Sequence, residues 1–200
     1  MRIARILGLA LMVVFGTTLM AQDRFEVFGA YSYLRFSPTI TGVGARSFNG
    51  GGGGAQLNFL KIFGIKGEFM GYGSTTFTGT FQGKTYTANG NMFTYLFGPV
   101  VRIPIWKVRP FGEVLFGGSN TNGYVNLESA INAGGGSITK TPTQHPFTMA
   151  LGGGLDIGLS PHIALRPAEF DYVLSRYTNP LTSTNNQNNF RYVGGVVFTF

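Results

Sequence analysis

The feature that most constrains this chain is its final stretch, residues 190–200, which reads F-R-Y-V-G-G-V-V-F-T-F. Side chains alternate between the two faces of a β-strand. One face would carry Phe190, Tyr192, Gly194, Val196, Phe198 and Phe200. Aromatic residues at both ends of an apolar face are typical of a strand that crosses a hydrocarbon slab between two interfacial girdles. The alternative is the last strand of a soluble sandwich, although an exposed terminal Phe forgoes about 2 kcal/mol of burial free energy.

The composition favours strands that are spread along the whole chain. Glycine contributes 31 of 200 residues and phenylalanine 19, while charged residues make up only 12%, about half the usual share. Hydrophobic residues reach 44% without a long apolar run after the N-terminus. This excludes a helical membrane protein, which needs about 20 consecutive apolar residues per span. The absence of cysteine excludes a disulfide framework and a thiolate metal site.

Residues 1–21 have the pattern of a secretory signal peptide. Arg2 and Arg5 precede an apolar stretch at residues 6–15, and a cleavage site ending at Ala21 follows. An uncleaved anchor helix is the alternative, but the apolar stretch is short for a span. We therefore expect a mature barrel domain of residues 22–200. The remaining basic residues are scattered, so we expect no nucleic-acid partner.

Seven further segments alternate in the same way as the last one. They are residues 25–36, 47–59, 63–75, 91–103, 108–120, 147–159 and 163–175. The last of these needs a β-bulge near Ala168 and Glu169 to keep Phe170 in phase with Ile163. The glycine run at residues 50–54 could be a flexible linker, but its flanks favour a strand that is packed closely inside or bends sharply.

The connections between these segments alternate between short and long. Short ones are expected at residues 60–62, 104–107 and 160–162, and long ones at 37–46, 76–90, 121–146 and 176–189. All short turns would then lie at one end of the molecule, which is the arrangement of outer-membrane barrels. The longest connection could hide a hairpin built from residues 124–127 and 137–139 around glycines 134–136. We interpret these as extensions above the membrane, with a ten-stranded barrel as the alternative.

The charged residues within the strands share the face opposite the aromatic set. They are Glu26, Lys66, Glu68, Arg102, Glu113, Asp156, Arg166, Asp171 and Arg191, with Glu169 depending on the bulge. Because charges are costly in lipid, this face should point into the barrel, where the charges must pair. We expect a plug of Glu68, Glu113 and Asp156 against Lys66, Arg166 and Arg191. A narrow ion-conducting lumen is the rival interpretation.

The sequence offers little for catalysis. His145 and His162 would lie at opposite ends of the barrel and cannot share a metal or a triad. A lipid-modifying enzyme at the rim would have only His145 with a loop hydroxyl as a candidate pair. The glycines at residues 50–54 lack the Lys-Ser/Thr of a phosphate loop. We therefore expect no enzyme activity, no cofactor and no metal.

The predicted signal peptide, eight alternating strands, sorted loops and terminal Phe200 together resemble the small outer-membrane β-barrels of the OmpA/OmpX type. The end of the chain is similar to the assembly signal of that family, carried here by Tyr192, Gly195, Phe198 and Phe200. Val193 departs from it, since a polar residue is expected there. The resemblance implies location in the outer membrane of a Gram-negative-type bacterium, contact with its lipid, and insertion by the barrel-assembly machinery. The peptidoglycan-binding domain that some relatives carry after the barrel is expected to be absent.

The sequence thus predicts an all-β, eight-stranded antiparallel up-and-down transmembrane barrel. We expect a monomer without enzymatic activity, with a structural or surface-interaction role through long extracellular loops that contact a ligand of unknown identity. A small pore for ions or solutes is the alternative function. A soluble ligand-binding barrel of the lipocalin type is the alternative fold, with the aromatic face inside and the charges outside.

Overall fold

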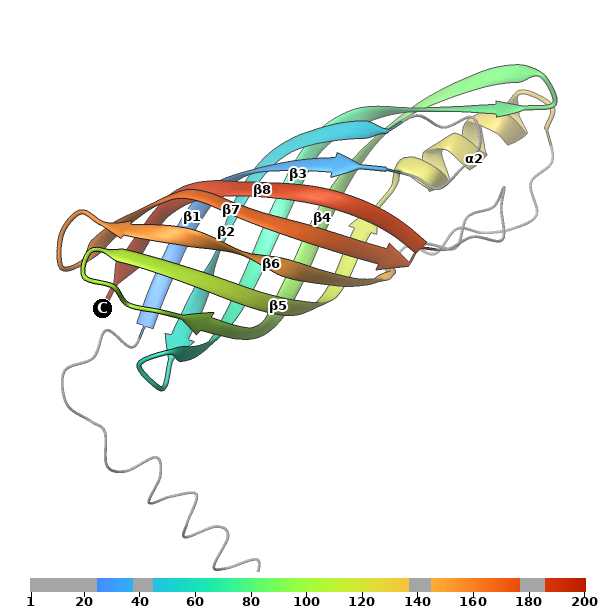
Figure 1. Cartoon of the computed structure of the whole chain (residues 1–200). Coiled ribbons are helices and arrows are strands. Elements are labelled where there is room, and N and C mark those ends of the chain that lie inside the picture. Colours follow the sequence, from blue (N-terminus) through green and yellow to red (C-terminus); the bar gives the residue numbers. More distant parts are fainter. Residues whose placement is uncertain (1–24, 38–44, 137–144, 177–185) are drawn as a thin grey trace, which may run out of the picture.

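The computed structural model describes residues 25–37, 45–136, 145–176 and 186–200, and these form one closed β-barrel (Figure 1). The strands and the one labelled helix are β1 (Phe25–Phe36), β2 (Arg46–Asn58), β3 (Phe63–Phe81), β4 (Lys84–Arg102), β5 (Val108–Thr121), α2 (Gly123–Ala133), β6 (Phe147–Gly158), β7 (Ile163–Arg176) and β8 (Asn186–Thr199). The predicted signal peptide, residues 1–21, lies outside the described residues.

Each strand pairs antiparallel with the next one along the chain, and β1 closes the barrel by pairing with β8. The closing ladder runs from Glu26 opposite Thr199 to Arg35 opposite Phe190. Closure leaves no open sheet edge around the barrel body. The predicted eight-stranded up-and-down fold is confirmed. No helix in the described ranges is long and apolar enough to cross a membrane.

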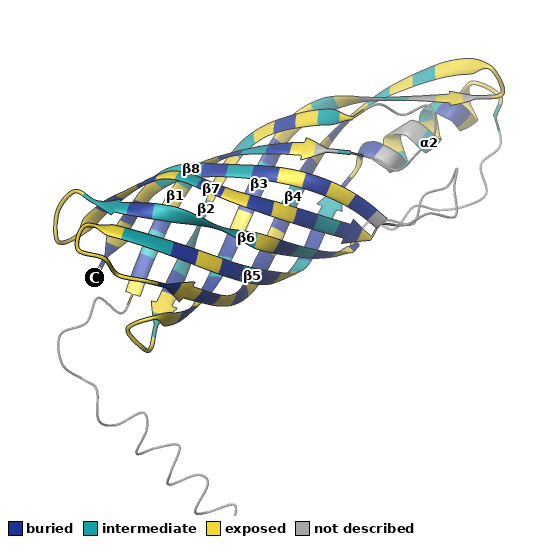
Figure 2. Cartoon of the chain, viewed as in Figure 1, coloured by how far each residue is buried: buried dark blue, intermediate teal, exposed yellow. Residues whose placement is uncertain are grey.

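Burial alternates along the strands, as Figure 2 shows. Large apolar side chains face outward along every strand; Phe97 is 65% exposed and Phe69 54%. Aromatic rings pair on this outer surface, with 5.6 Å between the ring centroids of Phe69 and Phe93 and 5.8 Å between those of Phe170 and Phe190. A soluble barrel would bury these rings, so the lipocalin-like arrangement with an aromatic interior is wrong.

The glycine run of β2 is regular strand, paired on one side with β1 and on the other with β3. A linker at this position is therefore excluded. Gly54 faces Phe28 across the ladder, and a Cβ atom there would lie 2.7 Å from the ring atom Cζ of Phe28. The glycine leaves the space that an inward-pointing phenyl ring occupies, so the strand is packed closely against its neighbour as expected.

The predicted bulge in β7 is confirmed. The pairing of β7 with β8 shifts between Arg166 and Glu169, and the pairing of β6 with β7 shifts between Leu155 and Ile157. The extra residues let both Arg166 and Glu169 point into the barrel, where each is almost fully buried. A regular ladder would place two residues three apart on opposite faces.

Short turns gather at one end of the barrel, together with the end of β8 (Figure 1). At the other end, the expectation of a loop at residues 76–90 is wrong. β3 and β4 continue as a two-stranded ribbon from Thr75 opposite Gly90 to Phe81 opposite Lys84, after a register shift beyond Tyr72. Threonine is abundant here and favours strand conformation, and Gly83, with φ of +74°, closes the tight turn.

The expected β character of residues 124–127 is also wrong, because they belong to helix α2. Ile131 is buried, and Asn126 donates from Nδ2 to the carbonyl oxygen of Asn89 in β4 at 2.7 Å. Contact with the ribbon therefore holds a helix that has no capping side chain of its own. Glycines 134–136 end this helix and do not form a hairpin turn, and residues 137–139 lie outside the described part of the chain.

Candidate functional site: the charged interior

All ten charged residues singled out on the inner face, including Glu169, are buried. They project from every strand except β2, so their partners come from across the barrel. Seven strands thus contribute charge to one interior volume. Ion pairs join these charges into a continuous network.

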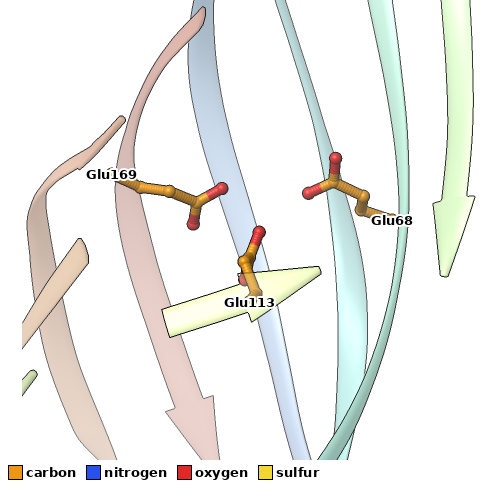
Figure 3. Close-up of side chains that lie close together, drawn as sticks. All are labelled: Glu68, Glu113 and Glu169. Carbon is orange, nitrogen blue, oxygen red and sulfur yellow. The ribbon is translucent and has the colours of Figure 1, made fainter. Parts of the chain in front are cut away.

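Lys66 of β3 occupies the centre. Its Nζ lies 2.9 Å from Glu113 Oε1 on β5, 3.0 Å from Glu169 on β7 and 3.2 Å from Glu68 on its own strand. Figure 3 shows the three carboxylates converging from these strands. Three carboxylates at such separations could hold a metal ion, but here the ammonium group already fills the position between them. The three carboxylates are therefore better explained as partners of the Lys66 ammonium group than as ligands of a metal ion.

Two arginines extend the network on either side of this centre. Arg166 donates from Nε to Asp156 Oδ1 at 2.7 Å and from Nη1 to Glu169 Oε2 at 2.8 Å. Arg191 donates from Nε to Asp171 Oδ2 at 2.8 Å and from Nη1 to Glu68. Of the three carboxylates around Lys66, Glu68 and Glu169 therefore also pair with an arginine, whereas Glu113 pairs with Lys66. Such pairing is the condition for burying so many charges.

A third arginine closes the network at the short-turn end. Arg102 makes a bidentate pair with Glu26, with both contacts at 2.6 Å, and reaches Asp156 at 3.4 Å. Arg109 approaches the same Glu26 at 3.5 Å. Arg109 was not among the charges predicted for the inner face, although it shares the parity of Glu113 along β5.

The charges of this network nearly balance. Six carboxylates, those of Glu26, Glu68, Glu113, Asp156, Glu169 and Asp171, face five cations, those of Lys66, Arg102, Arg109, Arg166 and Arg191. Within the set expected to pair, Glu68 contacts Lys66 and Arg191, and Asp156 contacts Arg166.

Two inward-pointing phenyl rings flank the cations. The guanidinium carbon of Arg166 lies 4.4 Å from the ring centroid of Phe111 and 5.0 Å from that of Phe28, and Lys66 Nζ lies 5.0 Å from the Phe28 centroid. Such cation–π contacts are strengthened where water is excluded. Neither ring was predicted to face inward, although Phe28 shares the parity of Glu26 along β1.

Toward the long-loop end the interior becomes apolar and then uncharged polar. Met70 and Leu115 are fully buried beyond the charges. A short hydroxyl series follows, in which Ser119 Oγ lies 2.8 Å from Thr148 Oγ1, and Thr148 Oγ1 lies 3.4 Å from Ser175 Oγ. The barrel is therefore filled by different side-chain chemistries at successive levels.

The residues of the predicted assembly signal lie at the barrel surface and ladder. Tyr192, Phe198 and Phe200 belong to the outer face, where the Phe200 ring centroid lies 6.3 Å from that of Phe25. Gly195 lies opposite Arg166 in the ladder. Recognition of these residues by an assembly machinery stays a prediction.

The two histidines lie at opposite ends, as expected. His145, at the long-loop end, contacts Asn120 Nδ2 through Nδ1 at 3.2 Å, and His162 Nδ1 lies 3.1 Å from the carbonyl oxygen of Thr199 at the short-turn end. The two rings cannot act in one catalytic group.

Comparison with known proteins gives matches in structure only. No family model matches the sequence, and no curated protein is similar to it at a significant level. Among solved structures, the chain is similar to Neisserial surface protein A, with a TM-score of 0.63 and 12% identity over 88% of this chain and 97% of the other. The chain has the fold of the small eight-stranded outer-membrane β-barrels.

Two further solved structures support this assignment. The outer membrane protein OprG from Pseudomonas aeruginosa matches with a TM-score of 0.60 and 13% identity, covering 88% of this chain and 95% of that one. The N-terminal β-barrel domain of Pseudomonas aeruginosa OprF matches with a TM-score of 0.50 and 13% identity, covering 90% and 98%. The shared fold agrees with the apolar outer surface, which is suited to the lipid of an outer membrane.

Proposed function

We propose that this protein is a monomeric outer-membrane barrel with a closed lumen, whose role is structural or depends on contacts made by the parts that project beyond the membrane. The observation that carries the closed lumen is the ion-pair network centred on Lys66. Its side chains come from strands on all sides of the barrel, so they meet in the middle instead of lining a wall.

A conducting lumen would need a continuous path of water. An eight-stranded barrel is just wide enough to be filled by side chains, and here Lys66, Met70 and Leu115 each have no exposed surface. The buried charges are engaged with one another at hydrogen-bonding distance, which leaves them unavailable as successive sites for a passing ion. These features support a plug over a pore.

The ribbon and helix at the long-loop end support a surface role. The ribbon formed by β3 and β4 extends beyond the closed barrel. Two hydrogen bonds attach α2 and the residue before it to β4: Asn126 Nδ2 donates to the carbonyl oxygen of Asn89, and Asn122 Oδ1 accepts from the backbone N–H of Asn91 at 2.9 Å. A supported ribbon loses less entropy on binding than a free loop would. Its exposed side chains include threonines, Gln82 and Lys84, which suit contacts with polar ligands.

The proposal includes neither an enzyme activity nor a cofactor. A hydrolase or acyltransferase at the rim would need a base oriented toward a nucleophile. The side-chain partner that the described residues offer His145 is Asn120, which is not a nucleophile. A lipid-product assay on the purified protein in vesicles tests this. Formation of a product by the unmodified protein, and its loss in His145→Ala, would overturn this part of the proposal.

Conductance in planar lipid bilayers tests the closed lumen. The purified protein should give no reproducible single-channel steps, because the network leaves no continuous water path. A matched variant, Lys84→Gln, changes a cation of the ribbon and should be equally silent. Reproducible steps of one size, altered by Glu113→Gln but not by Lys84→Gln, would favour the small pore instead.

A further inference from the structure

The short-turn end of the barrel contains a cavity of about 870 Å³. Residues from all three short turns line its wall, among them Lys61, Trp106 and Ser160. Its floor includes Glu26 and Arg102, which form the outermost layer of the charged interior. The cavity therefore opens at the short-turn end and stops at the network.

The cavity carries an excess of positive charge. Its lining includes four cations, Lys61, Arg102, Lys107 and Arg109, but Glu26 is the one carboxylate among the lining residues. Arg102 takes both oxygens of Glu26 at 2.6 Å, so Arg109 is left with a longer contact of 3.5 Å. Neither lysine forms an ion pair with a carboxylate of the described ranges. An anion would complete this arrangement.

A buried donor at the floor is also unused. Arg102 is 7% exposed, and its Nε–H has no hydrogen-bond partner in the described part of the chain. A buried donor left without a partner costs free energy. Arginine presents its N–H groups in a planar fork that matches the oxygens of phosphate and carboxylate groups. Because Glu26 already holds both terminal nitrogens of Arg102, an oxyanion at the floor would be received by Arg109, whose contact with Glu26 is the longer one.

Apolar side chains surround the mouth of the cavity. Ile62 and Leu159 are 44% and 64% exposed, and Trp106 is 90% exposed. Trp106 lies beside Lys107, whose Nζ is 5.3 Å from the ring centroid. Tryptophan is enriched at the level of lipid headgroups. A basic cavity with an apolar mouth suits a ligand that carries both an anionic group and an apolar part.

We propose that this cavity binds the phosphate group of an anionic ligand. The chemistry is that of a phosphomonoester or phosphodiester, with its oxygens on Arg109 and its remaining charge near Lys61 and Lys107. The phosphate could belong to an anionic phospholipid of the adjoining leaflet or to a soluble phosphate compound. The apolar mouth favours the phospholipid, because acyl chains could lie against it while the headgroup enters the cavity.

Trp106 gives a direct readout, because it is the single tryptophan of the chain and it lines the cavity. The protein would be placed in nanodiscs of phosphatidylcholine, and its fluorescence recorded in two titrations. In one the nanodiscs contain increasing fractions of phosphatidylglycerol, and in the other sn-glycerol 3-phosphate is added to the solution. Site binding predicts a saturable change that weakens as the salt concentration rises.

Two variants decide whether the response belongs to the cavity. Lys61→Gln combined with Lys107→Gln removes both turn cations and should weaken binding by about tenfold, in line with the loss of two contributing charges. The control, Lys84→Gln, removes an exposed lysine at the opposite end of the molecule and should bind as the unmodified protein does. Heat-modifiability on a gel would verify that each variant is folded.

The two titrations separate the sources of the phosphate. A saturable response to phosphatidylglycerol alone assigns the cavity to the lipid headgroup, and an equal or stronger response to glycerol phosphate assigns it to a soluble compound. The proposal is overturned if neither titration saturates. It is also overturned if the double lysine variant and Lys84→Gln bind with the same affinity.

Discussion

At the scale of single residues, the ammonium group of Lys66 lies among three carboxylates and offsets part of their mutual repulsion. Glu113 and Glu169 each approach it with both oxygens within 3.0 Å. The attraction is strong because no water reaches the group, but the same burial makes the loss of one partner costly. The network is therefore sensitive to changes that remove a single charge.

Replacing Lys66 by methionine tests this directly. We expect Lys66→Met to lower the free energy of unfolding by about 3–5 kcal/mol, because it leaves buried carboxylates without their central cation. Urea unfolding in phospholipid vesicles would measure the change. Adding Glu113→Gln should restore part of the loss, and Lys84→Met on the exposed ribbon should have little effect. Equal stability of Lys66→Met and Lys84→Met would contradict the assigned role.

Gly152, beside the network, is a second position at which a substitution should lower stability. A Cβ atom at Gly152 would lie 2.0 Å from Asp171 Oδ1 and 2.2 Å from the carbonyl oxygen of Phe170. Gly152→Ala should therefore destabilise the barrel by about 1–3 kcal/mol, as overpacking does. Gly67→Ala is the control, since a Cβ there meets nothing within 4 Å. Unchanged urea unfolding of Gly152→Ala would show that the site can relax.

The sequence predicted which face each charged residue occupies, but it could not predict the pairings. Alternation assigns Lys66 and Glu113 to the inner face because the side-chain period is two. Whether they meet depends on the stagger between strands, which no local pattern encodes. Phe28 and Phe111 were missed because aromatic residues were associated with the outer surface, although their parity places them inside.

At the scale of elements, the eight strands form a closed barrel, and the far ends of β3 and β4 form a ribbon that projects beyond it. The body of the β3–β4 ladder runs from Phe63 opposite Val101 to Tyr72 opposite Met92, and the ribbon begins after the register shift that follows. The charged interior lies entirely on the barrel side of that shift. The two parts should therefore be separable.

Shortening the ribbon tests this separation. Replacing residues 76–89 by the two-residue turn Asn-Gly, which suits a tight hairpin, should leave a folded barrel, because the ladders that enclose the network remain complete. A retained mobility shift on boiling, together with unchanged far-UV circular dichroism of the strands, would meet this expectation. Loss of the heat-modifiable form would mean that the ribbon is needed for the barrel to fold.

The strand positions followed well from the sequence, whereas the ribbon and α2 did not. Residues 76–90 are rich in threonine and glycine, and this composition favours a loop, although Phe77, Phe81 and Tyr86 each stand between polar or small residues as in a strand. In the ribbon, main-chain pairing does not require a buried face. Helix α2 lacks a capping hydrogen bond and acidic residues in its first turn, so the usual start signals of a helix were absent.

At the scale of the whole molecule, the barrel has its apolar surface outside and its charges inside. This distribution is the reverse of a soluble protein, in which charged residues are almost never fully buried. It follows from the solvent: lipid makes outward charges costly, and an interior of paired charges is tolerated once each has a partner. The alternation in the sequence was sufficient to predict this inversion, because it placed almost all strand charges on one face.

A membrane barrel must hold its aromatic face in lipid, and quenching of tryptophan fluorescence measures whether it does. In a Trp106→Phe background, Phe97→Trp would place a single tryptophan on an outer position that is 65% exposed. Phospholipids brominated on their acyl chains should quench its fluorescence strongly, while a tryptophan at Thr85 in the ribbon, introduced by Thr85→Trp, should remain unquenched. Equal and weak quenching at both positions would contradict the membrane barrel and favour a barrel that stands in water.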